Sequence, residues 1–190
     1  AWSFEGVNQE SRVGCSVATA GDANGDGYAD IAASAPYASP ALQNEGYWML
    51  RLGGSDTMPL DFASRGGQEA AYEGWRVAAA GDVNGDGSGD VIVAAPFYDE
   101  GGLADAGRVV VYEVTLNPPS VRPLFNAWGG QAQAGEGSAV ALGDFDGDGF
   151  ADAATGGGGY DGPGQADAGR VRVFRGGATG IEETASWTSL

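Results

Sequence analysis

The sequence of 190 residues contains no histidine and no lysine, so its nine cationic side chains are all arginine. The absence of histidine excludes a Ser-His-Asp catalytic triad and any histidine-ligated metal site. The nine arginines face 26 acidic side chains, which gives a formal net charge of −17. Nucleic acids and anionic membrane surfaces bind to basic patches, so we expect neither as a partner.

The single cysteine, Cys15, excludes a disulfide within the chain. It lies in the apolar run 13–17, and we expect it to be a small buried residue rather than a reactive thiol. No hydrophobic run approaches the length of a membrane span, so we expect no membrane insertion. The sequence starts at Ala1 without a methionine and shows no signal peptide, which we interpret as a processed or trimmed segment.

Glycine is abundant, with 35 residues, and aspartate is concentrated in a nine-residue motif that occurs three times. Oxygen-bearing side chains stand at motif positions 1, 3, 5 and 9, and glycine stands at position 6. Alternate side chains of such a loop converge on one point, position 7 adds its backbone carbonyl, and the glycine permits a positive φ. Hard cations such as Ca²⁺ take about six to eight oxygen ligands, so the pattern predicts three cation-binding loops. The motif occupies residues 22–30, 82–90 and 144–152.

Alignment of the three motifs reveals a repeat of about 60 residues. One short apolar segment precedes each motif, and three segments rich in β-branched or aromatic residues follow it, separated by Gly, Pro, Asn and Asp. This pattern is typical of β-strands, and no segment shows sustained helical periodicity. Four strands per repeat indicate an all-β protein, a β-propeller of three four-stranded blades in which each motif is the turn of the first hairpin. Within a single propeller segment 1–190, the expected blades are 12–64, 75–127 and 137–188, and 1–5 is a spare copy of the last strand.

Propellers close with about four to eight blades, so three blades leave the ring open. Trp2 and Trp187 align with the same position of the fourth strand, which places copies of that strand at both ends of the chain. Two explanations remain open: the chain is part of a longer propeller with further blades, or copies of the chain self-associate. Two copies would close a six-blade ring with two-fold symmetry, and we favour this explanation.

The segments 14–17 and 34–36, on either side of the first motif, resemble the FG-GAP repeat of integrin α-subunit β-propellers and their bacterial relatives. The second copy ends similarly at 94–96, and the resemblance covers almost the whole chain. No copy retains the Phe-Gly pair, and Gly158 stands where the third copy would have proline.

The resemblance implies structural Ca²⁺ ions on one face of the propeller, with partners bound through loops on the opposite face. The first expected ligand set is Asp22, Asn24, Asp26 and Asp30 with the Tyr28 carbonyl. The second is Asp82, Asn84, Asp86 and Asp90 with the Ser88 carbonyl. The third is Asp144, Asp146, Asp148 and Asp152 with the Phe150 carbonyl. Because the third set has four carboxylates rather than three, we expect it to bind the ion at least as tightly as the others.

These features predict a calcium-stabilised, non-catalytic binding or adhesion module of an extracellular or cell-surface protein, of bacterial origin. We expect no enzymatic activity, because most of the loop carboxylates are committed to the ions. Two alternatives remain: a calcium-dependent propeller lectin that binds glycans, and an accessory domain of a larger surface enzyme. EF-hand and dockerin loops are excluded, because both require a following helix where this sequence is β-like.

Two loops between second and third strands, 97–106 and 159–168, share a Tyr-Asp pair and an Ala-Asp-Ala segment. The shared residues reflect either a recent duplication of the blade, which we favour, or a repeated ligand subsite.

Overall fold

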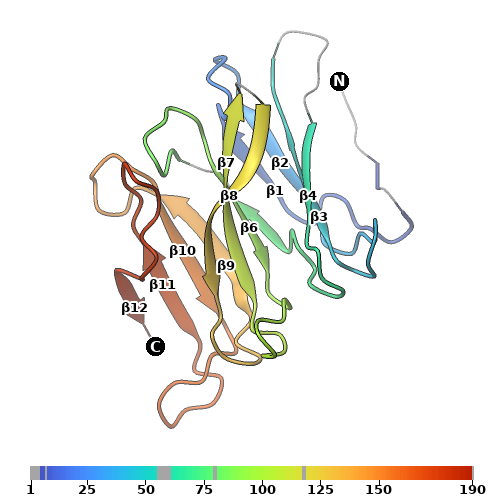
Figure 1. Ribbon diagram of the computed structural model, residues 1–190, viewed down its shortest axis with the longest axis vertical. Helices are drawn as coiled ribbons and strands as arrows, with labels where there is room; N and C mark the ends of the chain where they lie inside the picture. The colour runs from blue at the N-terminus through green and yellow to red at the C-terminus, as the bar shows by residue number, and fades with distance from the viewer. Residues whose placement is uncertain (1–4, 7, 55–60, 79–80, 117–118, 190) are drawn as a thin grey trace.

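The computed structural model describes residues 5–6, 8–54, 61–78, 81–116 and 119–189. In these residues twelve β-strands form three four-stranded antiparallel sheets, and none of the described residues is helical (Figure 1). The sheets succeed one another along the chain and lie face against face. The predicted all-β fold of three four-stranded blades is confirmed, and the described part of the chain forms an open arc rather than a closed ring.

Each sheet is a meander in which neighbouring strands are consecutive in the chain. The first sheet contains β1 (Val17–Gly21), β2 (Asp30–Ala35), β3 (Tyr47–Arg51) and β4 (Asp61–Arg65). The second contains β5 (Arg76–Ala78), β6 (Val91–Ala95), β7 (Arg108–Leu116) and β8 (Pro119–Trp128). The third contains β9 (Glu136–Gly143), β10 (Asp152–Gly157), β11 (Arg170–Phe174) and β12 (Trp187–Ser189).

The middle sheet is covered on both faces, and its sequence reflects this position. All five residues of β6 are buried, and the strand is a continuous apolar run rather than an alternating one. Val91 and Val93 pack into the cluster shared with the first sheet, whereas Ile92 and Ala94 pack into the cluster shared with the third. Two hydrophobic cores therefore alternate with three sheets, as in neighbouring propeller blades.

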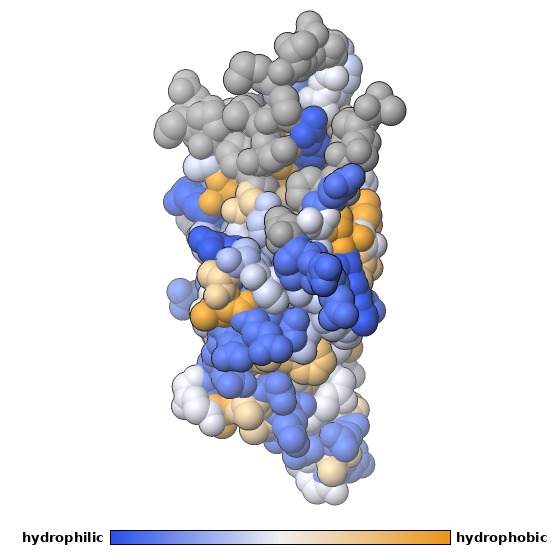
Figure 2. Space-filling model, turned by 90° about the vertical axis from the view of Figure 1, so that its right-hand side faces the viewer, coloured by the Kyte–Doolittle hydropathy of each residue, from blue (hydrophilic) through white to orange (hydrophobic). Residues whose placement is uncertain are grey.

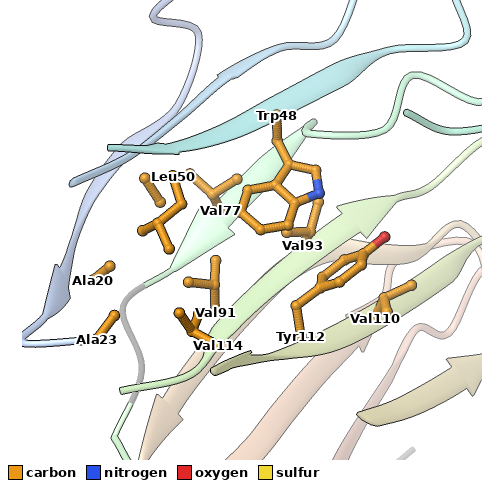
Figure 3. Packing of buried hydrophobic residues seen from close by; sticks show 11 residues of the cluster. Ala20, Ala23, Trp48, Leu50, Val77, Val91, Val93, Val110, Tyr112 and Val114 are labelled. Carbon is orange, nitrogen blue, oxygen red and sulfur yellow. The ribbon is translucent and has the colours of Figure 1, made fainter. Parts of the chain in front are cut away.

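Aromatic side chains of the third and fourth strands fill the space between sheets. The rings of Trp48 on β3 and Tyr112 on β7 lie 4.8 Å apart between their centroids (Figure 3). Phe125 on β8 and Phe174 on β11 lie 4.9 Å apart between the next pair of sheets. Aromatic pairs at this separation are favourable beyond the area they bury, so these contacts help to fix the angle between sheets.

The two end sheets each have a neighbour on one face only. Val17 on β1 is 61% exposed, and Val171 on β11 is 45% exposed. On the side of the molecule seen in Figure 2, hydrophobic side chains form separate patches among hydrophilic ones rather than one continuous surface. Trp187 on β12 is also exposed, whereas its expected counterpart Trp2 lies outside the described residues.

The expectation that Cys15 is buried is wrong, because its side chain is exposed. The strand β1 begins only at Val17, and Cys15 lies in the preceding turn, where its N–H donates to the Arg12 carbonyl at 3.2 Å. Gly14 has a φ of 88°, which turns the chain before the sheet begins. The short apolar run therefore contains a turn rather than a buried strand.

Candidate metal centres

The three motifs lie where the sequence placed them, between the first and second strands of each sheet. Residues 22–30 connect β1 to β2, residues 144–152 connect β9 to β10, and residues 82–90 lead into β6. Figure 1 shows these turns at the upper ends of their sheets, along one edge of the arc.

Each loop is folded around its position-1 carboxylate. The N–H of the position-6 glycine donates to that carboxylate in all three loops, at 2.8, 2.7 and 3.1 Å. The glycines at positions 4 and 6 have φ values between 68° and 95°, a region that L side chains rarely adopt. The positive φ predicted at position 6 is therefore confirmed. The position-7 residues Tyr28, Ser88 and Phe150 donate their own N–H to the position-5 carboxylate.

The position-9 aspartates anchor the loops to the sheets. Asp30, Asp90 and Asp152 are each at most 1% exposed, and each lies next to or at the start of its second strand. One oxygen of each accepts the N–H of the position-2 residue, at 2.7, 2.9 and 2.8 Å. A buried carboxylate must be paired or hydrogen-bonded to stay charged, so these bonds hold the aspartates within the turn.

The second oxygen of the position-9 aspartate distinguishes the middle loop. In the first and third loops it accepts an N–H from Gly53 or Gly176, at 2.6 and 3.0 Å. In the middle loop, Asp90 Oδ1 is buried and has no hydrogen-bond partner among the described residues. The equivalent third-strand residue there is Val114, which lies opposite Val121 in the extended ladder of β7 and β8.

Burial raises the pKa of Asp90 to about 7, against the lowering effect of the Val83 N–H, and the charges of Asp86 and Asp82 raise it further. Burial also raises the pKa of Asp30. A cation in the middle loop would favour the ionised form of the Asp90 carboxylate.

The third loop brings three carboxylates into one cluster. One oxygen each of Asp144, Asp146 and Asp152 lies within 4.8 Å of the others. Close carboxylates repel one another, and a divalent cation reverses the sign of that interaction. All expected donors in the three loops are carboxylate, amide or carbonyl oxygens, which are the ligands that Ca²⁺ prefers.

Sequence reasoning missed two charged residues that contact the loops from the third strand side. Arg175 Nε lies 3.1 Å from Asp146 Oδ2, and the amide of Asn84 donates to Glu113 Oε1 at 3.4 Å. Glu113 and Arg175 each lie five residues after the first residue of the third strand of their sheet. Alignment of the repeats would therefore have shown that these two positions are equivalent, but not that they contact the loops.

An aromatic cluster lies at the opposite ends of the first two sheets, away from the metal loops. It consists of Tyr37, Tyr72, Trp75 and Phe97, whose rings contact one another at centroid distances of 5.2 to 6.4 Å. The Arg12 guanidinium lies 4.1 Å from the centroid of the Tyr37 ring.

A small hollow of about 120 Å³ adjoins this cluster, and Arg12, Tyr37, Trp75 and Arg76 are among the residues that line it. Neither arginine forms an ion pair with another described residue, although the chain carries an excess of carboxylates. The edge away from the metal loops thus combines partly exposed aromatic side chains with positive charge.

The residues shared by the two long loops have structural roles in both copies. Arg108 lies over the ring of Tyr98 at 4.2 Å, and Arg170 lies over the ring of Tyr160 at 3.9 Å. The aspartate after each tyrosine accepts an N–H from the aspartate six residues further on, at 2.9 and 2.8 Å. These contacts within the blades account for the shared residues without a ligand.

Comparison with known proteins places these features in one family. The model of the FG-GAP repeat matches residues 14–47, 74–112 and 137–174, together more than half of the chain, and each match contains one motif. Integrin alpha-IIb of Homo sapiens is 40% identical over 128 residues, which cover 64% of this chain and 12% of the relative. Integrin alpha-V of Gallus gallus is 33% identical over 184 residues, which cover 93% and 16%.

A third relative is an enzyme by name. Phosphatidylinositol-glycan-specific phospholipase D of Mus musculus is 40% identical over 88 residues, which cover 44% of this chain and 10% of the relative. The chain therefore spans 10 to 16% of the length of these three relatives. Among the described residues, no helix is long and apolar enough to cross a membrane.

Proposed function

Because the chain belongs to the FG-GAP repeat family, we propose that it is a calcium-stabilised, non-catalytic binding module of an extracellular or cell-surface protein. One observation carries this proposal: three carboxylate-rich loops lie along one edge of the arc (Figure 1), and a partly exposed aromatic cluster lies at the opposite ends of the first two sheets. The first edge is suited to metal ions that hold the blades, and the second is suited to a partner.

The proposed ions are structural. In each loop the side chains at positions 1, 3, 5 and 9 and the carbonyl at position 7 would hold the cation. The protein would supply fixed oxygens, and the ion would neutralise carboxylates that otherwise repel one another. Because each loop is the turn of a first hairpin, the ion would also fix the start of its blade.

The proposed partner surface is the aromatic cluster with its two arginines. Phe97 is 38% exposed, and Tyr72 and Trp75 are partly buried against it. Aromatic and arginine side chains are enriched at the energetic centres of protein interfaces. The guanidinium groups of Arg12 and Arg76, which form no ion pair with the described residues, favour a protein ligand with acidic side chains.

The test is a pair of arrays, one of extracellular proteins and one of glycans, probed with the chain in millimolar calcium and again after chelation. We expect protein ligands that bind only in calcium. Phe97→Ala and Trp75→Ala should weaken this binding at least about tenfold, as the loss of a central aromatic residue does. Trp187→Ala removes an exposed aromatic residue distant in the chain and serves as the matched control. Equal binding by all variants would refute the proposed surface.

Two other functions have one supporting observation each. A hollow of about 540 Å³, lined by Trp128, Asn126 and Glu183 among others, lies between β8 and the loop that joins β11 to β12, and would suit a glycan. The similarity to a phospholipase D favours an accessory domain of an enzyme. Glycan binding lost in Trp128→Ala would select the first, and a catalytic domain in the flanking sequence would select the second.

We also propose that further blades complete the ring, since each end sheet leaves one face without a neighbour. These blades would come from a second copy of the chain or from additional sequence of a longer protein.

A further inference from the structure

Position 3 of the motif differs between loops, and so does the residue that faces it from the third strand. In the middle loop position 3 is Asn84, whose amide donates to Glu113 Oε1 at 3.4 Å. In the third loop position 3 is Asp146, whose Oδ2 lies 3.1 Å from Arg175 Nε. In the middle loop the Asn84 amide thus faces the Glu113 carboxylate, and in the third loop the Asp146 carboxylate faces the Arg175 guanidinium.

These two facing residues occupy the same structural position. Val91 on β6 pairs with Tyr112, the residue before Glu113, and Ala153 on β10 pairs with Phe174, the residue before Arg175. In the first sheet the equivalent residue is Leu52, because Ile31 on β2 pairs with Arg51.

The first loop shows what happens when the facing residue is neutral. Its position 3 is Asn24, and among the described residues the Asn24 amide donates within the loop, to Asp26 Oδ2 at 2.9 Å. The Asn24 oxygen accepts the Asp26 N–H at 2.8 Å, as the Asn84 oxygen accepts the Asp86 N–H at 2.9 Å. The orientation of the position-3 amide is therefore the same with and without a facing carboxylate.

The facing residues equalise the charge of the three loops. Among the described residues, the first loop has three aspartates and no facing charge, and the third has four aspartates and one facing arginine. The middle loop has three aspartates and is faced by Glu113. The negative charge of Glu113 is offset by Arg122, whose Nη2 lies 2.5 Å from Glu113 Oε2. Each site therefore has a net formal charge of −3 when its facing residue and, in the middle loop, the Arg122 that pairs with Glu113 are included.

We propose that the facing position on the third strand, Leu52, Glu113 or Arg175, tunes the calcium affinity of each loop so that the three sites load over a similar range. This inference rests on the proposed calcium binding. Arg175 offsets the fourth carboxylate of the third loop, so that loop does not bind more tightly than the others, contrary to what its motif alone predicts. Glu113 and Arg122 form a neutral pair beside the Asn84 amide and so leave the net charge of the middle loop unchanged.

Site-resolved titration by NMR tests this inference. The amide N–H of Gly27, Gly87 and Gly149 donates to the position-1 carboxylate of its own loop, so each resonance reports one site. Calcium is added to the ¹⁵N-labelled full chain in the presence of a competing chelator. In the unaltered chain we expect three dissociation constants within about tenfold of one another.

The decisive variants change position 175 and its partner. A unit charge several ångströms from the ion at the protein surface changes affinity by about tenfold. Arg175→Leu should therefore lower the dissociation constant reported by Gly149 about tenfold and leave the Gly27 constant unchanged. Asp146→Asn should raise the dissociation constant reported by Gly149 at least about tenfold. The double variant, which reproduces the Asn and Leu of the first loop, should return it to within about twofold of the unaltered value.

Two further variants keep the test decisive if Arg175→Leu disturbs folding, which the dispersion of the spectrum reveals. Leu52→Arg places a cation beside the first loop and should raise the Gly27 constant about tenfold. Arg65→Leu removes an exposed arginine at the end of β4 away from the loops, and should change none of the three constants.

The outcomes separate the two proposals. If calcium shifts none of the three glycine amides in the unaltered chain, calcium binding and the inference both fail. If all three shift but Arg175→Leu and Leu52→Arg leave their constants within twofold of the unaltered values, calcium binding stands and the inference is overturned.

Discussion

The guanidinium of Arg170 lies 3.0 Å from the carboxylate of Glu136, a side chain that is only 1% exposed. The same relationship occurs one blade earlier between Arg108 and Glu73. In each case the glutamate precedes or begins the first strand of a sheet and the arginine begins the third, so the pair ties the inner part of a blade to its outer part. Because these charges are buried, their effect on stability depends on which partners remain when one is removed.

The two pairs predict unequal losses of stability. Glu136 keeps Arg172, 3.0 Å away, when Arg170 is removed, whereas Glu73 keeps only the Tyr112 hydroxyl as a described side-chain partner when Arg108 is removed. Arg108→Met should lower the free energy of unfolding by about 3 to 5 kcal/mol, because it leaves a buried charge uncompensated. Arg170→Met should cost at least about 1 kcal/mol less. Urea denaturation of both variants measures the difference, and equal losses would contradict the role of Arg172.

Tyr112 predicts a loss of stability at high pH. Its pKa is raised, first by burial and then by the neighbouring Glu73 charge, from the ordinary value of 10.0. The folded protein therefore holds the hydroxyl proton at pH values where the unfolded chain has released it. The stability this provides is present below pH 10 and is lost as the pH rises further.

Tyr112→Phe tests both parts of this argument. At pH 7 the variant should be less stable by about 1 to 3 kcal/mol, because Glu73 loses a donor in a buried site. Above pH 10 its free energy of unfolding should fall less steeply than that of the unaltered chain. Denaturation curves between pH 7 and about pH 11 measure both effects. If the free energy of unfolding falls equally steeply in both proteins above pH 10, another group controls the loss of stability at high pH.

Chelation of calcium should lower the melting temperature. At a calcium concentration about a thousand times the dissociation constant, each independent site adds about 4 kcal/mol to the folded state. Asp86→Ala should reduce this stabilisation more than Asn84→Ala, because Asp86 contributes a formal charge to the middle loop. Thermal melts in calcium and in excess chelator compare the variants. A melting temperature that chelator does not change would mean that the loops are plain turns.

The exposed thiol of Cys15 should react in the native state. A maleimide reagent should label it completely in calcium without denaturant, since the side chain lies at the surface next to the hollow lined by Trp75 and Arg76. Mass spectrometry gives the stoichiometry, and a Cys15→Ser variant gives the background. Labelling that appears only in denaturant would restore the sequence-based expectation of a buried cysteine.

The sequence predicted the repeat architecture because the cause is local. The three motifs, the positive φ of Gly27, Gly87 and Gly149, and the apolar run of β6 all follow from residues close together in the chain. Cys15 was mispredicted because a five-residue apolar run does not reveal whether a strand or a turn contains it.

The remaining features depend on contacts between distant residues. Glu73 and Arg108 are 35 residues apart in the chain, and Asp146 and Arg175 are 29 residues apart. No local sequence pattern therefore predicts either pair. The third strand of the middle sheet, β7, has nine residues where β3 and β11 have five, and this extension leaves Asp90 Oδ1 without the N–H that the other loops provide. Such effects appear only when sheets are stacked and compared position by position.

The open ends of the arc predict self-association of the isolated chain. Val17 and Val171 are exposed on the end sheets, where a neighbouring blade would cover them in a closed ring.

Native mass spectrometry in calcium should show two copies with six bound calcium ions, the composition of a six-blade ring with two-fold symmetry. Because the hydrophobic patches visible in Figure 2 are separated by hydrophilic residues, the dimer should be weak and should dissociate on dilution. Val171→Asp should favour the monomer, and Leu103→Asp, a similar change on an exposed loop residue, should not. A compact monomer with three calcium ions at all concentrations would instead show that the missing blades belong to a longer chain.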